Sequence, residues 1–600
     1  MAKCVVAELS ATATCNLLTR AECSGSGAMK QHLFTSLEVT SNGLANANAS
    51  QEMDMDLDLK LATGTAEILH SIISTTDKLR RFCYLGVIEA PVYSAKALDA
   101  IVECQFTALR KLCADVSEKQ LLDCLKSVLH PSNGQRLPRP DESLLVLAIY
   151  LSMRSDERHL MVVRGHFVEL VRTDKQLLLF IRLVKHVQKL MKRKTLNRTV
   201  RKAVLQWYKH QTVDGLLQMW SVNGQSDWGM HRELLHRCHH NNNNNPFDAE
   251  TMAALYVLSS PVKELVKWPA CLEPVAKCKE TILGIAKLRA AQDPSLALVI
   301  IRQLSLSYEQ VPLHFMTDVN VANFLYGTMS FEQLLQHWPT FQRLDNANRA
   351  NALSNYAQHF ARMFNLRASD VEPFRLLLQE RRPQMHNKKI SVKQQPSFVQ
   401  NLYKNSFGFN KGLGLRLHIT INLEMSYMCK SLTGRWTSIK YLDAVVALAF
   451  GYFMSDNDVT VRIWHDKSGA LIDLPWLTTM SVDEAKATCE KQKVLKIKQT
   501  LTDVLDNALD DKQKVYDVFL VLVPCATRGN PKNNSEQLCQ RLDQYREKRN
   551  TNARFIIMSL RQHRASMSYS TVRNEHILEI CSISEQTTRV ISAFAHGNFF

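Results

Sequence analysis

Residues 182–209 read RLVKHVQKLMKRKTLNRTVRKAVLQWYK, a stretch with ten Lys or Arg and no Asp or Glu. Apolar residues recur at three- and four-residue steps on both sides of a break at 195–197, which predicts two successive amphipathic helices. Asn197, at the end of the break, can cap the second helix. The basic residues fall roughly opposite the apolar stripes, so the stretch predicts an organised cationic surface.

The outward-facing basic residues are the candidate phosphate contacts. A solvated helix face usually mixes both signs of charge, so two faces of one sign favour an anionic partner over the alternative, an ordinary basic surface. The candidates are Arg182, Lys185, Lys189, Lys192, Arg193, Arg198, Arg201 and Lys202. Residues 192–194 also fit a nuclear import signal, although the phosphate-binding interpretation already accounts for their charge.

Composition sets the broad class of the protein. The 600 residues are 46% hydrophobic and 22% charged, enough for several buried cores, and the formal net charge of +17 favours RNA, DNA or a membrane surface as partner. The 15 cysteines show no regular pairing, which indicates a reducing compartment. The longest apolar run, 444–454, is far short of the ~20 residues that cross a bilayer. We therefore expect a soluble monomer that is cytoplasmic, with the nucleus as a second compartment.

The pattern along the chain changes near residue 410. Residues 1–65 are rich in Ser, Ala, Thr and Asn and predict a disordered tail. Residues 66–395 predict helix after helix, with Ser117 and Asp141 as expected caps, and this favours an α-solenoid. Residues 396–410 predict a linker. In 411–600, β-rich runs at 415–421, 459–464, 517–523 and 554–560 alternate with helical stretches such as 438–453 and 536–548, as in a parallel or mixed sheet covered by helices.

Several short segments carry a resemblance to a known family. They are LRRFCYLG (79–86) followed by Tyr93, VRKAVLQWY (200–208), HRELLHRCH (231–239) and VEPFRLLLQ (371–379). Their order and approximate spacing resemble the Ro autoantigen family, the TROVE-domain RNA-binding proteins, and the α/β tail resembles that family's von Willebrand factor A domain. The resemblance covers about residues 70–600.

The resemblance implies a fold and a function. The fold would be an α-solenoid ring of HEAT-like helical repeats followed by a Rossmann-like α/β domain of the A type. Such a ring binds small noncoding Y RNAs on a basic outer surface and accepts single-stranded 3′ ends of misfolded RNAs in its central hole, a role in RNA quality control. His239 matches a family position at the RNA-binding surface, with His231 and Arg232 nearby. Before Trp228, however, Asn223 and Gln225 stand where the family has basic residues, so Y RNA binding is less secure than single-strand binding.

A second departure concerns the metal of an A domain, which is held by Asp-x-Ser-x-Ser, a Thr and a further Asp. The corresponding residues here are Asn422, Glu424, Ser426, Thr500 and Pro524. Proline offers no side-chain oxygen, so we expect a degenerate site and no cofactor, with a weakened cation site through Glu424 as the less favoured reading. A zinc site from His231, His236, Cys238 and His239 fits no standard spacing.

These observations lead to two functional hypotheses. The first is a non-catalytic RNA-binding protein of a small ribonucleoprotein, with noncoding RNA as its partner. The second is an adaptor that binds proteins through the solenoid and the A-like domain, with RNA binding reduced or lost. An enzyme is the weakest option, because the sequence has no Gly-rich phosphate loop, no HExxH pair and no convincing nucleophile elbow.

Overall fold

A computed structural model describes the chain from residue 74 to residue 599. The ranges outside the description within this span are 89, 95–97, 130–139, 154–155, 194–195, 224–227, 239–246, 261–275, 330–332, 334–371, 381–397, 409–411, 434–435, 466–469, 498–499, 527–530 and 563–574. The predicted tail at 1–65 and the candidate His239 lie outside the described residues. The chain forms two compact units, of which the first comprises 1–61, 167–178 and 195–364, and the second comprises 62–166, 179–194 and 365–600.

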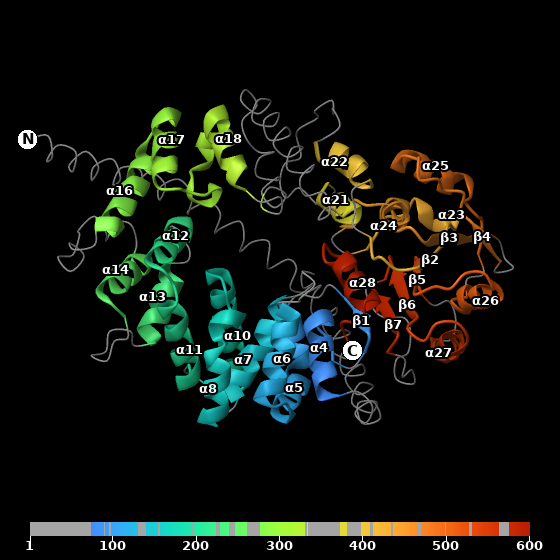
Figure 1. Ribbon diagram of the computed structural model, residues 1–600, viewed down its shortest axis with the longest axis horizontal. Coiled ribbons are helices and arrows are strands. Elements are labelled where there is room, and N and C mark those ends of the chain that lie inside the picture. Colours follow the sequence, from blue (N-terminus) through green and yellow to red (C-terminus); the bar gives the residue numbers. More distant parts are fainter. Residues whose placement is uncertain are drawn as a thin grey trace, which may run out of the picture. The chain divides into compact units, whose positions relative to one another are not determined.

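The first unit is helical in its described part, and helices that are close in sequence pack on one another. α12 packs on α14 and α16, α16 packs on α17, and α17 packs on α18. The elements are α9 (Phe167–Leu170), α11 (Arg198–Lys209), α12 (Val213–Asn223), α13 (Trp228–Arg237), α14 (Ala249–Leu258), α16 (Ala276–Ala290), α17 (Pro294–Gln303), η2 (Tyr308–Gln310), η3 (Leu313–Thr317) and α18 (Val319–Thr328). Figure 1 shows their order along the chain from teal to yellow-green.

The second unit begins with helices. They are α4 (Thr75–Leu85), α5 (Leu98–Asp115), α6 (Glu118–Leu129), α7 (Pro140–Met153) and α8 (Glu157–Gly165), and α10 (Asp174–Leu190) enters the unit at residue 179. Ser117 caps α6 as expected, because its Oγ accepts from Gln120 N at 3.3 Å and its N donates to Gln120 Oε1 at 3.1 Å. The expected cap at Asp141 is wrong: α7 already begins at Pro140, whose fixed φ suits the first helical position.

The stretch 396–410, for which the sequence predicts a linker, contains α22 (Phe398–Ser406). This helix packs on α21 (Pro373–Glu380). The Phe407 ring, just beyond α22, lies 5.4 Å from the ring of Phe450, and Lys404 pairs with Asp483 at 2.6 Å. Within the described part of this stretch, residues 398–408, α22 is therefore a packed element of the second unit.

The rest of the second unit is built on a seven-stranded sheet in the order β1-β7-β6-β5-β2-β3-β4. The strands are β1 (Val92–Tyr93), β2 (Leu417–Ile421), β3 (Val459–Trp464), β4 (Leu471–Asp473), β5 (Val518–Val523), β6 (Arg554–Ser559) and β7 (Ile577–Ile580). All pairs are parallel except β3 with β4. The four predicted β runs correspond to β2, β3, β5 and β6, whereas β1 comes from the region predicted to be helical.

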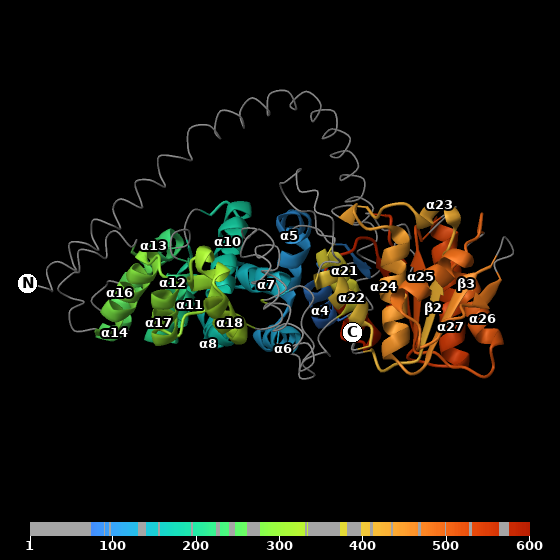
Figure 2. The same ribbon diagram turned by 90° about the horizontal axis from the view of Figure 1, so that it is seen from above.

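Helices cover both faces of this sheet (Figures 1 and 2). Phe519, Val521 and Phe555 lie in one apolar core with side chains of α26 (Thr502–Asp510) and α27 (Pro531–Lys548). α24 (Tyr441–Ser455), α25 (Val482–Lys491) and α28 (Thr587–Ala595) complete the domain with the short α23 (Met425–Met428). The predicted helices at 438–453 and 536–548 are α24 and α27. The chain therefore consists of a helical region followed by an A-type α/β domain.

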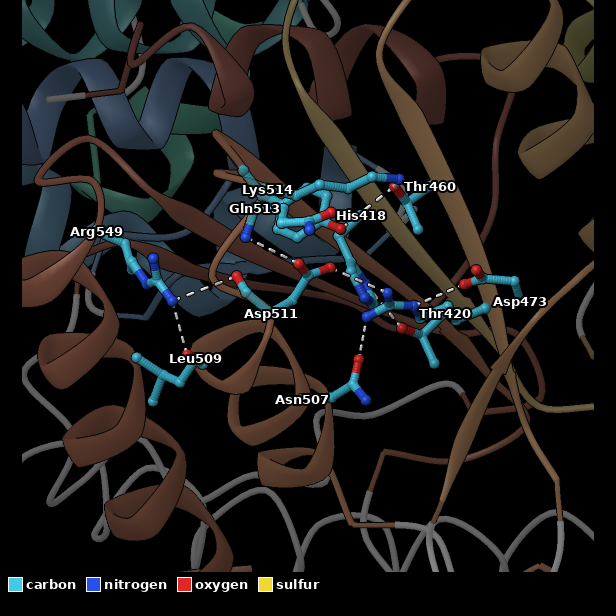
Figure 3. Close-up of polar contacts among 12 residues, drawn as sticks. His418, Thr420, Thr460, Asp473, Asn507, Leu509, Asp511, Gln513, Lys514 and Arg549 are labelled. Atoms are coloured by element: carbon cyan, nitrogen blue, oxygen red, sulfur yellow. Dashed lines mark hydrogen bonds and ion pairs between the residues drawn. The ribbon is translucent and has the colours of Figure 1, made fainter.

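A polar network lies beneath α26 at the β2–β3 side of the sheet (Figure 3). Arg462 on β3 donates its Nε to Asp473 on β4 at 2.8 Å and an Nη2 hydrogen to Asp511 at 3.2 Å, and it also contacts Asn507. Next to it, His418 is fully buried and its Nδ1 lies 3.2 Å from Thr420 Oγ1. These contacts fix the β3–β4 edge to α26.

No helix in the described ranges is long and apolar enough to cross a membrane.

Candidate nucleic-acid interface

The basic face of α10 is built on a well-defined helix. Thr173 and Gln176 form a reciprocal cap at its start, with Gln176 N to Thr173 Oγ1 and Thr173 N to Gln176 Oε1 both at 3.2 Å. The apolar stripe is buried, and it consists of Leu177, Phe180, Ile181, Val184 and Val187. The opposite side exposes Arg182, Lys185 and Lys189. These three residues, which belong to the second unit and which we call the α10 face, hold the positions that the helical period predicts.

The chain leaves α10 through a strained turn. Lys192 has φ +57, in the left-handed region that side-chain-bearing residues rarely adopt. After this turn, Arg193 N donates to Gln188 O of α10 at 2.8 Å, and Arg193 Nη1 donates to Ser152 O of α7 at 2.6 Å. Lys192 remains exposed. Arg193 therefore anchors the helix end with part of its guanidinium, and Lys192 is the more available cation.

The second basic face belongs to α11, in the first unit. Asn197 caps the helix as expected, accepting from Val200 N at 2.8 Å, and Trp207 Nε1 donates to Val171 O at 2.7 Å. Arg198 is exposed, whereas Arg201 and Lys202 are half-buried. Lys209 at the helix end, which is not one of the candidate phosphate contacts, is also exposed. Arg198 and Lys209 are thus the best-exposed cations of this helix, and we call them the α11 face.

The structure corrects the expectation for His231 on α13. This side chain is 0% exposed, and its Nδ1 lies 2.8 Å from Tyr208 Oη on α11. The two rings pack edge-on with their centroids 6.1 Å apart. Because α13 turns this face toward α11, His231 is part of the core and does not reach RNA. Its sequence neighbour Arg232 is exposed.

Of the four residues of the zinc hypothesis, the structure describes His231, His236 and Cys238, and His239 lies outside the described residues. His231 and Cys238 are buried, whereas His236 is exposed. Within the described ranges, no group of three or more His, Cys, Asp or Glu side chains is arranged to hold a metal ion.

The position of the A-domain cation lies where β2 and β5 end. Glu424 is buried, and its carboxylate accepts from Ser426 Oγ at 2.7 Å and from Ile497 N at 3.4 Å. Asn422 Oδ1 accepts from Glu424 N at 2.9 Å. Thr500 Oγ1 donates to Asp503 at 2.5 Å, and Pro524 follows β5.

These residues do not fit a divalent cation. Mg²⁺ requires near-octahedral oxygen ligands, usually with one or two carboxylates that face it. Of the five corresponding residues only Glu424 carries a carboxylate, and this group accepts from protein donors, while the Asn422 amide oxygen accepts from the backbone N of Glu424. These polar groups are therefore already bonded to protein partners, and Glu424 links the segment after β2 to Ile497.

Comparisons with known proteins agree with this architecture. Residues 416–595 match the family model described as the Ro60 vWA domain. No curated protein is significantly similar to the chain in sequence. In structure, the chain is similar to the crystal structure of the Deinococcus radiodurans Ro protein RSR, with a TM-score of 0.64 and 19% sequence identity over 88% of this chain and 100% of that one. The α/β domain of the chain thus matches the Ro60 vWA family model, and most of the chain shares the fold of the Deinococcus Ro protein.

Proposed function

We propose that the protein is a non-catalytic RNA-binding component of a small cytoplasmic ribonucleoprotein, with a nuclear fraction as a second location. Its ligands would be noncoding RNAs, either Y-like RNA or the single-stranded 3′ ends of misfolded RNA, held on a ring of HEAT-like repeats. The Ro fold supports RNA binding at the level of the family. The observation that carries the proposal for this chain is the exposure of Arg182, Lys185 and Lys189 on one side of α10.

The exposure of these cations suits phosphate binding. Their helix is already anchored by its buried apolar stripe and by the contact between Arg193 and Ser152. Cations on a rigid helix at three- and four-residue spacing offer a row of charges to a polyanion, and the affinity they supply depends on salt more than on base sequence. RNA with a free single-stranded 3′ end is the expected ligand, since residues that read base edges are not evident.

A salt series on the whole protein tests the proposal. Replacing Arg182, Lys185 and Lys189 together by Gln keeps helix propensity and removes three charges. For single strands, each phosphate contact adds about 0.7 to the steepness with which the logarithm of the RNA association constant falls with the logarithm of salt concentration. Loss of three contacts should therefore make this slope shallower by about 2. Replacing Arg198 and Lys209 tests the α11 face in the same way.

A matched control separates local contacts from net charge. Lys491, Lys512 and Lys548 are exposed on the A domain, and changing them to Gln alters the net charge equally. This control should keep the wild-type slope. If the control and the α10 variant weaken RNA binding equally, or if neither changes it, the α10 face is not the RNA contact.

The adaptor hypothesis has one observation in its favour. The carboxylate of Glu424 accepts hydrogen bonds from Ser426 and Ile497, so hydrogen bonds within the protein hold the segment that would bind a cation in a typical A domain. RNA crosslinking in cells distinguishes the two functions. An adaptor would copurify a defined protein partner and yield no RNA above background, whereas an RNA-binding protein would yield a reproducible set of transcripts.

A further inference from the structure

Three basic side chains lie at the amino-terminal edge of the sheet. Arg554 begins β6 and His576 immediately precedes β7, where Phe555 N donates to His576 O at 2.7 Å. Arg546 comes from the last turns of α27, and its Nε donates to Thr551 O at 2.8 Å in the turn that leads into β6. We call Arg546, Arg554 and His576 the edge cluster.

The guanidinium of Arg554 is held in place. Its Cζ lies 5.6 Å from the ring centroid of Phe594 on α28. Gly597 follows this helix with φ +77, and a Cβ at that position would come within 2.5 Å of Arg554 Nη2. Arg554 Nη1 is buried and makes no hydrogen bond to any residue in the described ranges. A donor that is buried and unsatisfied costs free energy unless a ligand completes it.

The carboxylate of Asp517, a residue whose backbone bonds Arg554, does not serve as the anion for this cluster. Arg554 N bonds the backbone oxygen of Asp517 at 3.0 Å, but the Asp517 side chain is used elsewhere. It accepts from Arg416 Nη2 at 2.7 Å and from Asn550 Nδ2 at 2.8 Å. Glu575, which immediately precedes His576, acts on another cation, because burial lowers the pKa of Arg81 and the charge of Glu575 raises it.

The electrostatics of the cluster show the resulting repulsion. Burial lowers the pKa of Arg554, and the charge of Arg546 lowers it further. Burial lowers the pKa of His576 to about 4, and Arg546 and Arg554 contribute to the same shift. An anion between these groups would relieve the repulsion.

We propose that the edge cluster is a binding site for a phosphate group, formed by Arg546, Arg554 and His576. The planar guanidinium donates pairs of parallel N–H bonds that match phosphate oxygens, and a second cation and an imidazole complete the donors. The site lies on the A domain and is separate from the proposed RNA contacts on α10 and α11. Free phosphate and the terminal phosphate of an RNA share this chemistry.

Thermal unfolding of the full chain tests the site. Inorganic phosphate should stabilise the wild type more than chloride at equal ionic strength and pH, because binding to the folded state alone shifts the equilibrium. Arg546→Gln should bind phosphate roughly tenfold to hundredfold more weakly, the scale of a lost hydrogen bond to a charged group. The control is Arg541→Gln, also on α27, whose Nε pairs with Asp506 at 3.0 Å and which should retain the wild-type response.

Two further measurements keep the result decisive. The first is phosphate binding by Arg554→Gln, which should be weaker than in the wild type. If this variant fails to fold, NMR of the wild type gives the same information. Phosphate should then shift the ring resonance of His576 and raise the pKa of His576. Competition by a 5′-phosphorylated RNA oligonucleotide, compared with its dephosphorylated form, tells whether an RNA end or free phosphate is the source. The proposal is wrong if phosphate stabilises the wild type and Arg546→Gln equally, or if phosphate does not stabilise the wild type more than chloride does.

Discussion

At the scale of the residue, Lys192 combines backbone strain with an exposed charge. Its φ of +57 places a side-chain-bearing residue where glycine is favoured, at a cost of about 1–2 kcal/mol. Lys192→Gly should therefore leave the protein as stable as the wild type or more stable by up to about 1 kcal/mol, measured by urea unfolding. If Lys192 binds phosphate, RNA affinity should fall in the same variant. Lys192→Asn, which tolerates this backbone, should lose the same affinity; wild-type affinity in both variants would remove Lys192 from the interface.

A second residue-scale prediction concerns His418. Burial is the main cause that lowers its pKa to about 3, from 6.5, and the charge of Arg462 adds to it. As the pH falls, His418 therefore takes up a proton in the unfolded chain before it does so in the folded protein. The contribution of its neutral ring to the free energy of unfolding is complete above pH 6.5 and is lost as the pH falls toward 3. Between pH 6.5 and 5 the wild type should lose roughly 1–2 kcal/mol more than His418→Gln, measured by urea unfolding. Equal losses in both proteins would show that other groups set the acid response.

At the scale of the element, the carboxylate of Asp456, which follows α24, accepts hydrogen bonds from the backbone just before β2. Asp456 accepts from Leu413 N at 2.9 Å and from Gly414 N at 2.6 Å. At Gly412, a Cβ would lie 2.3 Å from Asp456 Oδ1, so no side chain fits without displacing this carboxylate. Gly412→Ala should destabilise the protein by about 1–3 kcal/mol in thermal unfolding. Gly408→Ala is the matched control, since its Cβ meets nothing within 4 Å; similar losses in both would refute the contact.

The same scale shows what the sequence could predict. β5 is buried along all of Val518–Val523, and a continuous apolar run of that length between polar segments identifies a central parallel strand. β1 has only Val92 and Tyr93, too short for any period, and it becomes a strand because the edge of β7 accepts it. His231 could not be placed either, because the face of α13 that is buried depends on Tyr208 of another helix. Patterns within one element were predictable, whereas partners between elements were not.

At the scale of the molecule, the A domain is completed by a distant part of the chain. β1 pairs with β7 through Glu579 N to Pro91 O and Cys581 N to Tyr93 O, both at 3.0 Å, and Tyr93 Oη lies 2.7 Å from Ser584 Oγ. A fragment of residues 411–600 lacks this strand and leaves the β7 edge unpaired, which invites strand pairing between copies. It should unfold at a lower temperature than the A domain within the full chain and should self-associate.

Adding a peptide of residues 90–95 in excess should reverse part of both effects, because it can restore the edge. A peptide with Tyr93 replaced by Pro, which lacks a backbone N–H, is the control. Thermal unfolding and sedimentation measure the outcome. A fragment that is monomeric and as stable as the domain in the intact chain would show that β1 does not contribute to the stability of the sheet. Association and lower stability would instead show that the A domain depends on β1 from the amino-terminal part of the chain. This dependence is expected, because residues 62–166 and 365–600 belong to the same compact unit.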